Sequence, residues 1–189
     1  MQDFRNADFS DINDDFLRLC VTQMKVLHSI KFNATLNIPK FSLLDEIAKY
    51  ENLAFINITT KKEHKYLLDI ARKFDKTAES VLCHRDLQLP NIMILKTNII
   101  KDIKFIDFEY AGFSCVAWEL GNFSAELNLT KRQISFIAKC YGNISTLEIL
   151  QGQLLSNYIW CLWGFIYERI DLARDYLARF NDNLKELCR

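Results

Sequence analysis

The side chains best suited to chemistry lie in one stretch, residues 81–110. His84-Arg85-Asp86 follows a short apolar run, Asn91 comes five residues later, and Asp107 ends a second apolar segment. Transfer of a phosphoryl group needs an oriented hydroxyl and divalent cations on the phosphate oxygens, with little covalent help from the protein. Asp86 suits the hydroxyl, because a carboxylate can orient it and accept its proton. Asn91 and Asp107 supply the hard oxygen ligands that Mg²⁺ prefers.

Each part of this pattern is weak alone, because an Asp followed five residues later by an Asn is common and an Asp after a strand is often a turn former. Two apolar segments rich in β-branched residues, 91–95 and 103–108, are separated by the polar turn 96–98. They predict a hairpin that would hold the acidic side chains on a rigid backbone. The whole set, in this order, favours phosphoryl transfer over a purely structural role.

Segments 82–94 and 106–126 resemble the catalytic segments of the choline/ethanolamine kinases, within the wider aminoglycoside-phosphotransferase-like kinases. That family typically reads HxDxxxxN and then IDFEY. Two features separate the chain from protein kinases: Glu109 stands where they have the glycine of Asp-Phe-Gly, and no Ala-Pro-Glu follows. The resemblance extends over about residues 15–179.

The resemblance assigns roles to four residues of the 81–110 stretch. Asp86 is implied to be the catalytic base, and Asn91 and Asp107 are implied to be metal ligands. Gln88, which also matches the choline-kinase form of the loop, and Asp107 are implied to bind the nucleotide. The cofactors that follow from the resemblance are ATP and Mg²⁺.

Downstream, the chain departs from the family in two places. The family pattern is aromatic-Asp-Ile-Gly-Asn-His-Phe-x-Glu, and here residues 118–126 read WELGNFSAE. Glu119 replaces the usual Asp, and Phe123-Ser124 replaces His-Phe, so the local packing is not carried over from the family. Glu126 keeps its place.

A substrate hypothesis depends on Trp160 and Trp163, which are three residues apart and therefore share a helix face. A quaternary ammonium cannot donate hydrogen bonds, so aromatic faces and a carboxylate are the natural way to hold it. Glu126 would supply the charge and Tyr176 a further ring. Taken alone, two tryptophans at helical spacing are more often core residues. The similar Trp-x-x-Trp of choline and ethanolamine kinases, together with Glu126, favours a cation site.

Helical spacing and capping signals predict an α+β fold that is predominantly helical. Helices are expected over about 11–29 (capped by Ser10 or Asp11), from Ser42, over 60–74, 119–127, 131–141 (capped by Thr130), 146–169 (capped by Ser145) and 171–187. The small hairpin between them would carry the catalytic and metal-binding loops. His28 is interpreted as a polar residue at the end of the first helix rather than a catalytic one, and His64, among charged residues, as a solvated surface residue.

The composition of the chain limits which partners it can bind and in which cellular compartment it is expected. The 189 residues suit one domain, and Lys plus Arg equals Asp plus Glu, which gives no basic excess for nucleic acid or an anionic membrane. Six scattered cysteines without a CxxC pattern suit reduced thiols in a cytoplasmic protein. The N-terminus lacks a signal-peptide core, and the most apolar stretch, 158–165, is too short to insert into a membrane. The oligomeric state stays open.

The resemblance implies a domain division. Residues 12–189 would be a protein-kinase-like C-terminal lobe, and residues 1–11 a remnant of the linker between lobes. No Gly-rich, nucleotide-covering loop occurs among the five glycines, so the N-terminal nucleotide lobe is expected to be absent. These residues by themselves are therefore expected to bind ATP poorly and to be weakly active or inactive.

The expected function is transfer of the ATP γ-phosphate to the hydroxyl of a small amino alcohol, with choline favoured over ethanolamine. One alternative is a related small-molecule kinase acting on an aminoglycoside, thiamine or a sugar, which would favour an acidic pocket over paired tryptophans. Another is a non-catalytic kinase-lobe remnant that binds a partner.

Overall fold

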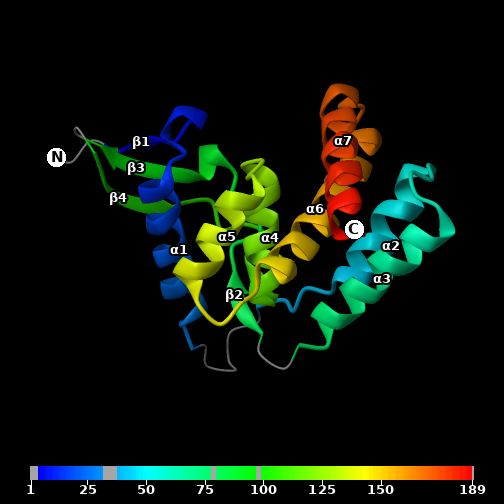
Figure 1. Cartoon of the computed structure of the whole chain (residues 1–189), viewed down its shortest axis with the longest axis horizontal. Coiled ribbons are helices and arrows are strands. Elements are labelled where there is room, and N and C mark those ends of the chain that lie inside the picture. Colours follow the sequence, from blue (N-terminus) through cyan, green and yellow to red (C-terminus); the bar gives the residue numbers. More distant parts are fainter. Residues whose placement is uncertain (1–3, 32–37, 78–79, 97–98, 189) are drawn as a thin grey trace.

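The computed structural model describes residues 4–31, 38–77, 80–96 and 99–188. Helices dominate this part of the chain, and two small sheets lie among them (Figure 1). The helices are α1 (Asp14–His28), α2 (Leu43–Ala54), α3 (Lys61–Asp75), α4 (Val116–Glu126), α5 (Lys131–Tyr141), α6 (Thr146–Ile166) and α7 (Ile170–Leu187), with short 3-10 turns η1 (Phe9–Asp11) and η2 (Leu89–Asn91). The expected α+β, mostly helical class is confirmed.

Both sheets are antiparallel and flank the 84–91 loop. In the larger sheet, β3 (Ile92–Lys96) lies between β1 (Arg5–Asn6) and β4 (Ile100–Phe105). In the smaller one, β2 (Val81–Cys83) pairs with β5 (Gly112–Ser114). The expected hairpin is therefore present, but β4 begins and ends earlier than the segment 103–108. The predicted turn 96–98 lies largely outside the described residues.

Side-chain caps fix most helix starts where the sequence predicts them. Ser42, Thr130 and Ser145 each accept the backbone N–H three residues on, and Thr60 does the same within a full capping box with Glu63. Asp75, at the end of α3, accepts the N–H groups of Leu43 at 2.8 Å and Leu44 at 3.0 Å. This carboxylate joins α3 to the start of α2.

Three helix boundaries differ from the prediction. Asn13, not Ser10 or Asp11, caps α1, because residues 9–11 form a separate turn capped by Asp8. Helix α4 begins at Val116, before the expected 119. Helix α6 ends at Ile166 rather than near 169, because Glu168 adopts a left-handed conformation (φ 56°) that turns the chain into α7.

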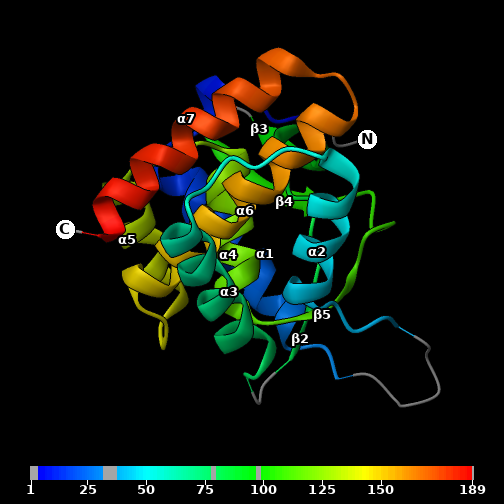
Figure 2. The ribbon, with the colours of Figure 1, turned by 90° about the vertical axis from the view of Figure 1, so that its right-hand side faces the viewer.

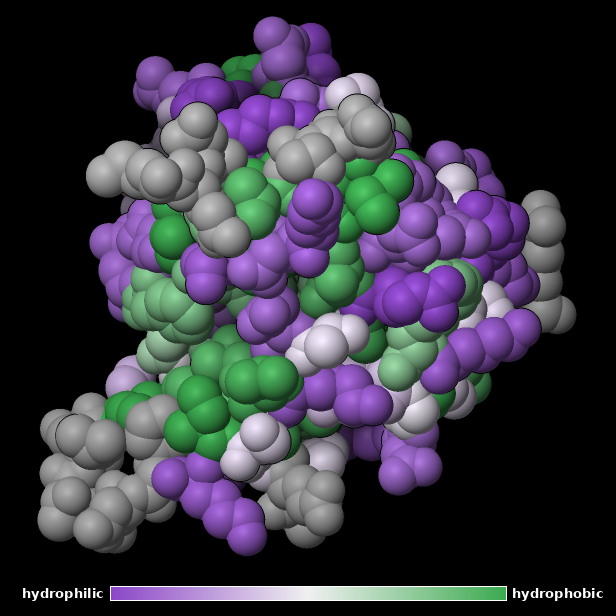
Figure 3. Space-filling model, turned by 90° about the vertical axis from the view of Figure 1, so that its left-hand side faces the viewer, coloured by the Kyte–Doolittle hydropathy of each residue, from purple (hydrophilic) through white to green (hydrophobic). Residues whose placement is uncertain are grey.

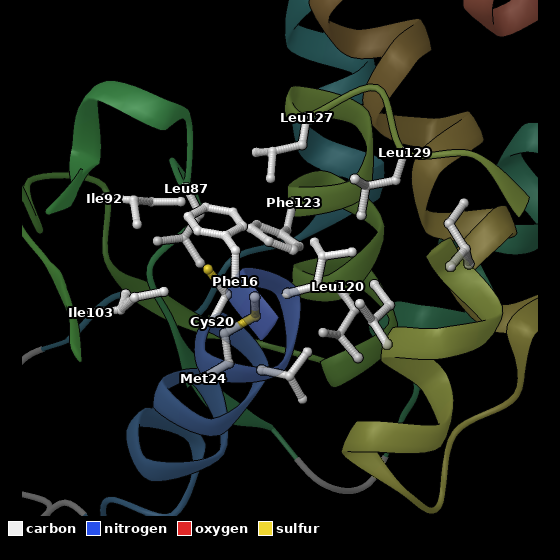
Figure 4. Packing of buried hydrophobic residues seen from close by; sticks show 14 of the residues in the cluster. Phe16, Cys20, Met24, Leu87, Ile92, Ile103, Leu120, Phe123, Leu127 and Leu129 are labelled. Atoms are coloured by element: carbon white, nitrogen blue, oxygen red, sulfur yellow. The ribbon is translucent and has the colours of Figure 1, made fainter. Parts of the chain in front are cut away.

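Two apolar clusters hold the helices together. One packs α1, α4 and α5 against the β3–β4 hairpin, and Figure 4 shows Phe16 of α1 and Phe123 of α4 at its centre. The other joins α2, α3, α6 and α7, and buries Phe180 and Leu67. Helix α6 packs against both α4 and α7 (Figure 2). It therefore belongs to the centre of the fold, which explains why it is apolar on nearly every side.

Helices α4 and α6 touch backbone to backbone. A Cβ on Gly121 would lie 2.4 Å from the Cα of Gly152, and a Cβ on Gly152 would lie 2.3 Å from the carbonyl oxygen of Ala117. Only glycine allows this approach, which brings the C-terminal half of α6 beside the 84–91 loop that α4 supports.

Part of the molecular surface on the hairpin side is apolar. Figure 3 shows apolar side chains exposed among polar ones on the hairpin side, where Val26, Ile30 and Phe108 line a shallow hollow of about 280 Å³. Within the described ranges, no helix combines the length and the apolar character needed to cross a bilayer.

Candidate active site

The 84–91 loop brings Asp86 and Asn91 together. It leaves β2 at Cys83 and returns to β3 through the 3-10 turn η2. Asn91 Nδ2 donates to the backbone oxygen of Asp86 and to Asp86 Oδ2, both at 2.8 Å. The amide nitrogen thus faces the carboxylate, and the Asn91 side chain is almost fully buried behind it.

Asp107 reaches the same region from the end of β4. The Ile106 N–H donates to the backbone oxygen of Asn91 at 3.1 Å, which ties the strand end to the 84–91 loop. Asp107 adopts a left-handed backbone conformation (φ 63°), unusual for a residue other than glycine. Such strained positions concentrate where a side chain must be aimed.

His84 links the loop to this strand end. Its Nδ1 lies 3.3 Å from the Asp86 N–H, and its Nε2 lies 2.8 Å from the backbone oxygen of Ile106. Since the amide can only donate and the carbonyl can only accept, the ring is neutral with its proton on Nε2. Burial lowers the pKa of His84, which is consistent with that form. The ring also packs on Phe108, with centroids 4.4 Å apart.

Side chains of helix α4 hold the backbone of the 84–91 loop through hydrogen bonds. Glu119 Oε1 accepts the His84 N–H at 2.7 Å and Oε2 accepts the Arg85 N–H at 3.2 Å, while Asn122 Nδ2 donates to the Arg85 carbonyl at 3.0 Å. Arg85 itself is left-handed (φ 70°). These three bonds fix the strained residue that immediately precedes Asp86.

One cleft of about 520 Å³ collects the expected site residues except Asn91. Asp86, Gln88, Asp107, Glu126, Trp160, Trp163 and Tyr176 all line it. Gln88 Nε2 lies 3.2 Å from Asp86 Oδ2. Side chains separated by up to 90 positions in the sequence therefore face one space, which the motifs predict.

Glu126 lies in the wall of this cleft with an altered acidity. Burial, and to a lesser degree the charge of Asp86, raise the pKa of Glu126 to about 7. The hydroxyl of Tyr176 donates a hydrogen bond to the carboxylate at 3.2 Å, which partly offsets this rise in the pKa. The carboxyl therefore changes charge near neutral pH. Tyr176 is buried and held in place by this bond.

The two tryptophans form an aromatic wall on α6. Trp160 and Trp163 meet edge to face with centroids 5.9 Å apart, and Trp163 packs on Tyr167 at 4.9 Å. Trp160 Nε1 donates to Asn122 Oδ1 at 3.1 Å, which orients its ring. Both tryptophans are only partly buried, so they are not simple core residues.

Sequence reasoning missed several residues of this region. Glu46, Lys49 and Tyr50 of α2 line the cleft opposite α6, and nothing in their local sequence marks them. Asn122 was not singled out, although it lies within the segment 118–126 that carries the resemblance. His28 ends α1 as expected, partly buried against Tyr141, while His64, interpreted as a solvated surface residue, pairs with Glu51 at 2.8 Å.

The chain is similar in sequence to known choline and ethanolamine kinases. A family model described as choline/ethanolamine kinase matches residues 8–159. Ethanolamine kinase 2 of Rattus norvegicus is 25% identical over 208 residues, covering 89% of this chain and 52% of its own length. Ethanolamine kinase 1 of Homo sapiens is 24% identical, covering 92% and 48%. The chain spans about half the length of these curated relatives.

Solved structures share the fold. Choline kinase LicA from Streptococcus pneumoniae has a TM-score of 0.76 at 20% identity, covering 98% of this chain and 68% of its own. The wild-type aminoglycoside 2'-phosphotransferase-IIIa in its GDP complex has a TM-score of 0.63 at 13% identity, covering 94% and 63%. At these identities the likeness establishes the kinase-like fold.

Proposed function

The chain belongs to the choline/ethanolamine kinase family, and from this premise we propose that it carries the acceptor and metal side of a phosphotransferase. The reaction is transfer of the ATP γ-phosphate to the hydroxyl of a small amino alcohol. The observation that carries the proposal is the shared cleft, in which Asp86 and Asp107 face the same space as Glu126 and the Trp160–Trp163 wall.

Asp86 is the base in this proposal. The loop contacts described above hold it at the cleft, and Asn91 fixes its carboxylate by donating to Oδ2. A carboxylate held this way orients the acceptor hydroxyl and takes its proton as the phosphorus–oxygen bond forms.

Asn91 and Asp107 fit Mg²⁺ by their chemistry. Their amide and carboxylate oxygens are hard donors, and the Asn91 amide already points its nitrogen at Asp86, which leaves its oxygen as an acceptor. When bound, Mg²⁺ neutralises charge on the phosphate oxygens. Gln88 would donate its amide N–H to the nucleotide, and Asp107 would hold the phosphates through the ion.

The acceptor is a small amino alcohol, with choline favoured. Trp160, Trp163 and Tyr176 offer ring faces to a cation, and Glu126 offers a countercharge. An acceptor with a primary ammonium, such as ethanolamine, would gain from hydrogen-bond acceptors as well, and the sequence relatives named ethanolamine kinases make it the principal competitor. Aminoglycosides, thiamine and sugars follow, as acceptors that need more polar contacts than this wall provides.

Residues 12–189 correspond in this proposal to the C-terminal lobe and residues 1–11 to the interlobe linker, although β1 within that linker pairs with β3. The chain spans about half of its curated relatives. We expect these residues by themselves to bind ATP weakly and to turn over slowly or not at all.

Two measurements test the proposal. Calorimetry with choline, ethanolamine and kanamycin on the 189-residue chain should give choline the highest affinity, and a preference for kanamycin would contradict it. After incubation with Mg²⁺-ATP and choline, with phosphocholine detected by mass spectrometry, any signal should be slow, absent in Asp86→Asn and retained in Asp102→Asn, which alters a partly exposed carboxylate on β4. A phosphocholine signal that survives Asp86→Asn would contradict the role of Asp86. ATP binding in the micromolar range would contradict the expected weak nucleotide affinity.

A further inference from the structure

Three side chains from three elements converge beneath the 84–91 loop, away from the cleft. His28 is the last residue of α1, Cys83 the last of β2, and Glu119 lies in the first turn of α4. One ligand atom from each lies within 4.8 Å of the others. Cys83 and Glu119 are fully buried, and His28 is partly buried. An imidazole, a thiol and a carboxylate are the three side-chain types that bind zinc.

The imidazole of His28 is arranged as metal-binding histidines are. Its Nδ1 lies 2.9 Å from the hydroxyl of Tyr141, and its Nε2 is buried without a hydrogen-bond partner among the described residues. If Nδ1–H donates to the hydroxyl, Nε2 carries the lone pair that a metal ion requires. Histidine ligands commonly have their second nitrogen held by such a partner, which fixes the tautomer. Burial lowers the pKa of His28 to about 4, so the ring is neutral at physiological pH.

A hydrogen-bonded cluster alone does not account for this arrangement. Glu119 accepts the N–H groups of His84 and Arg85 and also a hydrogen bond from the thiol of Cys83, whose other neighbours are the more distant carbonyl oxygens of Val81 at 3.6 Å and Cys115 at 4.0 Å. None of these contacts gives His28 Nε2 a partner. A buried polar atom of this kind calls for an explanation, and an ion is one of the recognised ones.

We propose that His28, Cys83 and Glu119 form a binding site for a divalent metal ion of the zinc class. Binding replaces the Cys83 S–H bond with a metal–sulfur bond and releases the proton to solvent, with no change of oxidation state. Tetrahedral zinc places its ligand atoms roughly 3.5 Å apart, and the three atoms lie within 4.8 Å of one another before any ion binds, so a small contraction would complete the geometry. A nitrogen–sulfur–oxygen set selects zinc or cobalt over Mg²⁺, which prefers oxygen alone.

The site lies where a bound ion would act on the 84–91 loop. Glu119 holds the two amides just before Asp86, and His28 belongs to α1, which shares an apolar cluster with Leu87 of this loop. An ion there would connect α1, β2 and α4 through one centre. We therefore expect it to raise the thermal stability of the whole chain, since it binds the folded state alone.

Cobalt(II) gives a direct readout, because a cobalt–thiolate bond produces a charge-transfer absorption in the near ultraviolet. The 189-residue chain is stripped with a chelator, titrated with Co²⁺ and then challenged with Zn²⁺ or Mg²⁺. We expect one equivalent of Co²⁺ with the thiolate band, displaced by Zn²⁺ and not by Mg²⁺. Cys83→Ser should abolish the band, while Cys161→Ser, which removes a buried thiol elsewhere, should keep it.

Variants of His28 and of its partner Tyr141 distinguish a metal ligand from a residue that only packs. His28→Gln should weaken Co²⁺ binding by at least about tenfold, and Tyr141→Phe, which removes only the hydroxyl behind Nδ1, should weaken it by about 10–100-fold. His64→Gln, which alters the histidine paired with Glu51, should change nothing. Metal-free circular dichroism and melting curves establish that each variant is folded.

Several outcomes would overturn the site. They are the absence of a thiolate band in the unmodified chain, a band that survives Cys83→Ser, or an affinity that His28→Gln leaves unchanged. If Cys83→Ser fails to fold, the decision falls to His28→Gln and Tyr141→Phe, which leave the buried strand intact. The binding measurement does not depend on phosphotransferase activity, so the two proposals fail separately.

Discussion

The carboxylate of Glu119 accepts the backbone N–H of His84 at 2.7 Å, across 35 positions of sequence. The same carboxylate accepts the N–H of Arg85, whose left-handed backbone would otherwise be unsupported. Burial raises the pKa of Glu119 to about 7, although the two hydrogen bonds favour the ionised carboxylate and lower the pKa. A residue that departs from the family pattern is therefore the main support of the 84–91 loop.

Glu119→Gln should destabilise the protein by about 1–3 kcal/mol, because the amide NH₂ would face one of the two buried N–H groups and leave it unpaired. Urea unfolding measures the change. Glu109→Gln alters an exposed carboxylate and should change stability by less than about 0.5 kcal/mol. Equal stability of Glu119→Gln and the unmodified chain would show that the loop does not depend on this contact.

Cation binding should strengthen as the pH rises through about 7. Glu126 has a pKa raised to about 7, so it is mostly neutral below that value and mostly ionised above it. An ionised carboxylate attracts the ammonium group, and a neutral one does not. Choline affinity measured by calorimetry from pH 6 to 8 should increase. Glu126→Gln should flatten this profile, Glu168→Gln should retain it, and a flat profile in the unmodified chain would refute the assignment.

Trp163→Leu should weaken choline binding more than ethanolamine binding. A cation over an aromatic face contributes about 0.5–2 kcal/mol, which corresponds to a loss of roughly 2–30-fold. Ethanolamine retains hydrogen bonds to carboxylates when the ring is removed, so its loss should be smaller. Paired titrations of both ligands check the ratio. Equal losses would indicate that Trp163 acts through packing with Tyr167 rather than through the ligand.

Gly152→Ala should destabilise the fold by more than about 3 kcal/mol, because the new methyl group meets the backbone of Ala117 and no side chain can move aside. Gly142→Ala is the comparison: its Cβ would enter open space and meet only the strain of a backbone conformation (φ 78°, ψ 167°) that side chains rarely adopt, about 1–3 kcal/mol. Thermal unfolding ranks the two variants. The reverse order would mean that α4 and α6 separate easily.

Local signals account for what the sequence predicts correctly. The caps Thr60 and Ser145 with their glutamate partners are complete within four residues, and the 92–105 hairpin follows from two β-branched runs. The convergence of Asp86 and Glu126 was expected from the family resemblance. None of these features requires knowledge of distant contacts.

The missed features depend on tertiary contacts. The left-handed turn at Glu168 has no glycine or asparagine to announce it, so the end of α6 was placed too late. The burial of His28 depends on Tyr141, 113 positions away. The role of Glu119 depends on how close α4 lies to the 84–91 loop, and Gly121 and Gly152 set the position of that helix only once α6 is in place.

The bond between Asp75 and the start of α2 makes one unit of α2 and α3. Because this carboxylate closes the two helices at their shared end, Glu46 and Tyr50 cannot adjust independently of the pair. A ligand entering between α2 and α6 therefore meets a preassembled wall. Glu46 and Tyr50 both line the cleft, so this part of its wall is expected to move together with α3 rather than one side chain at a time.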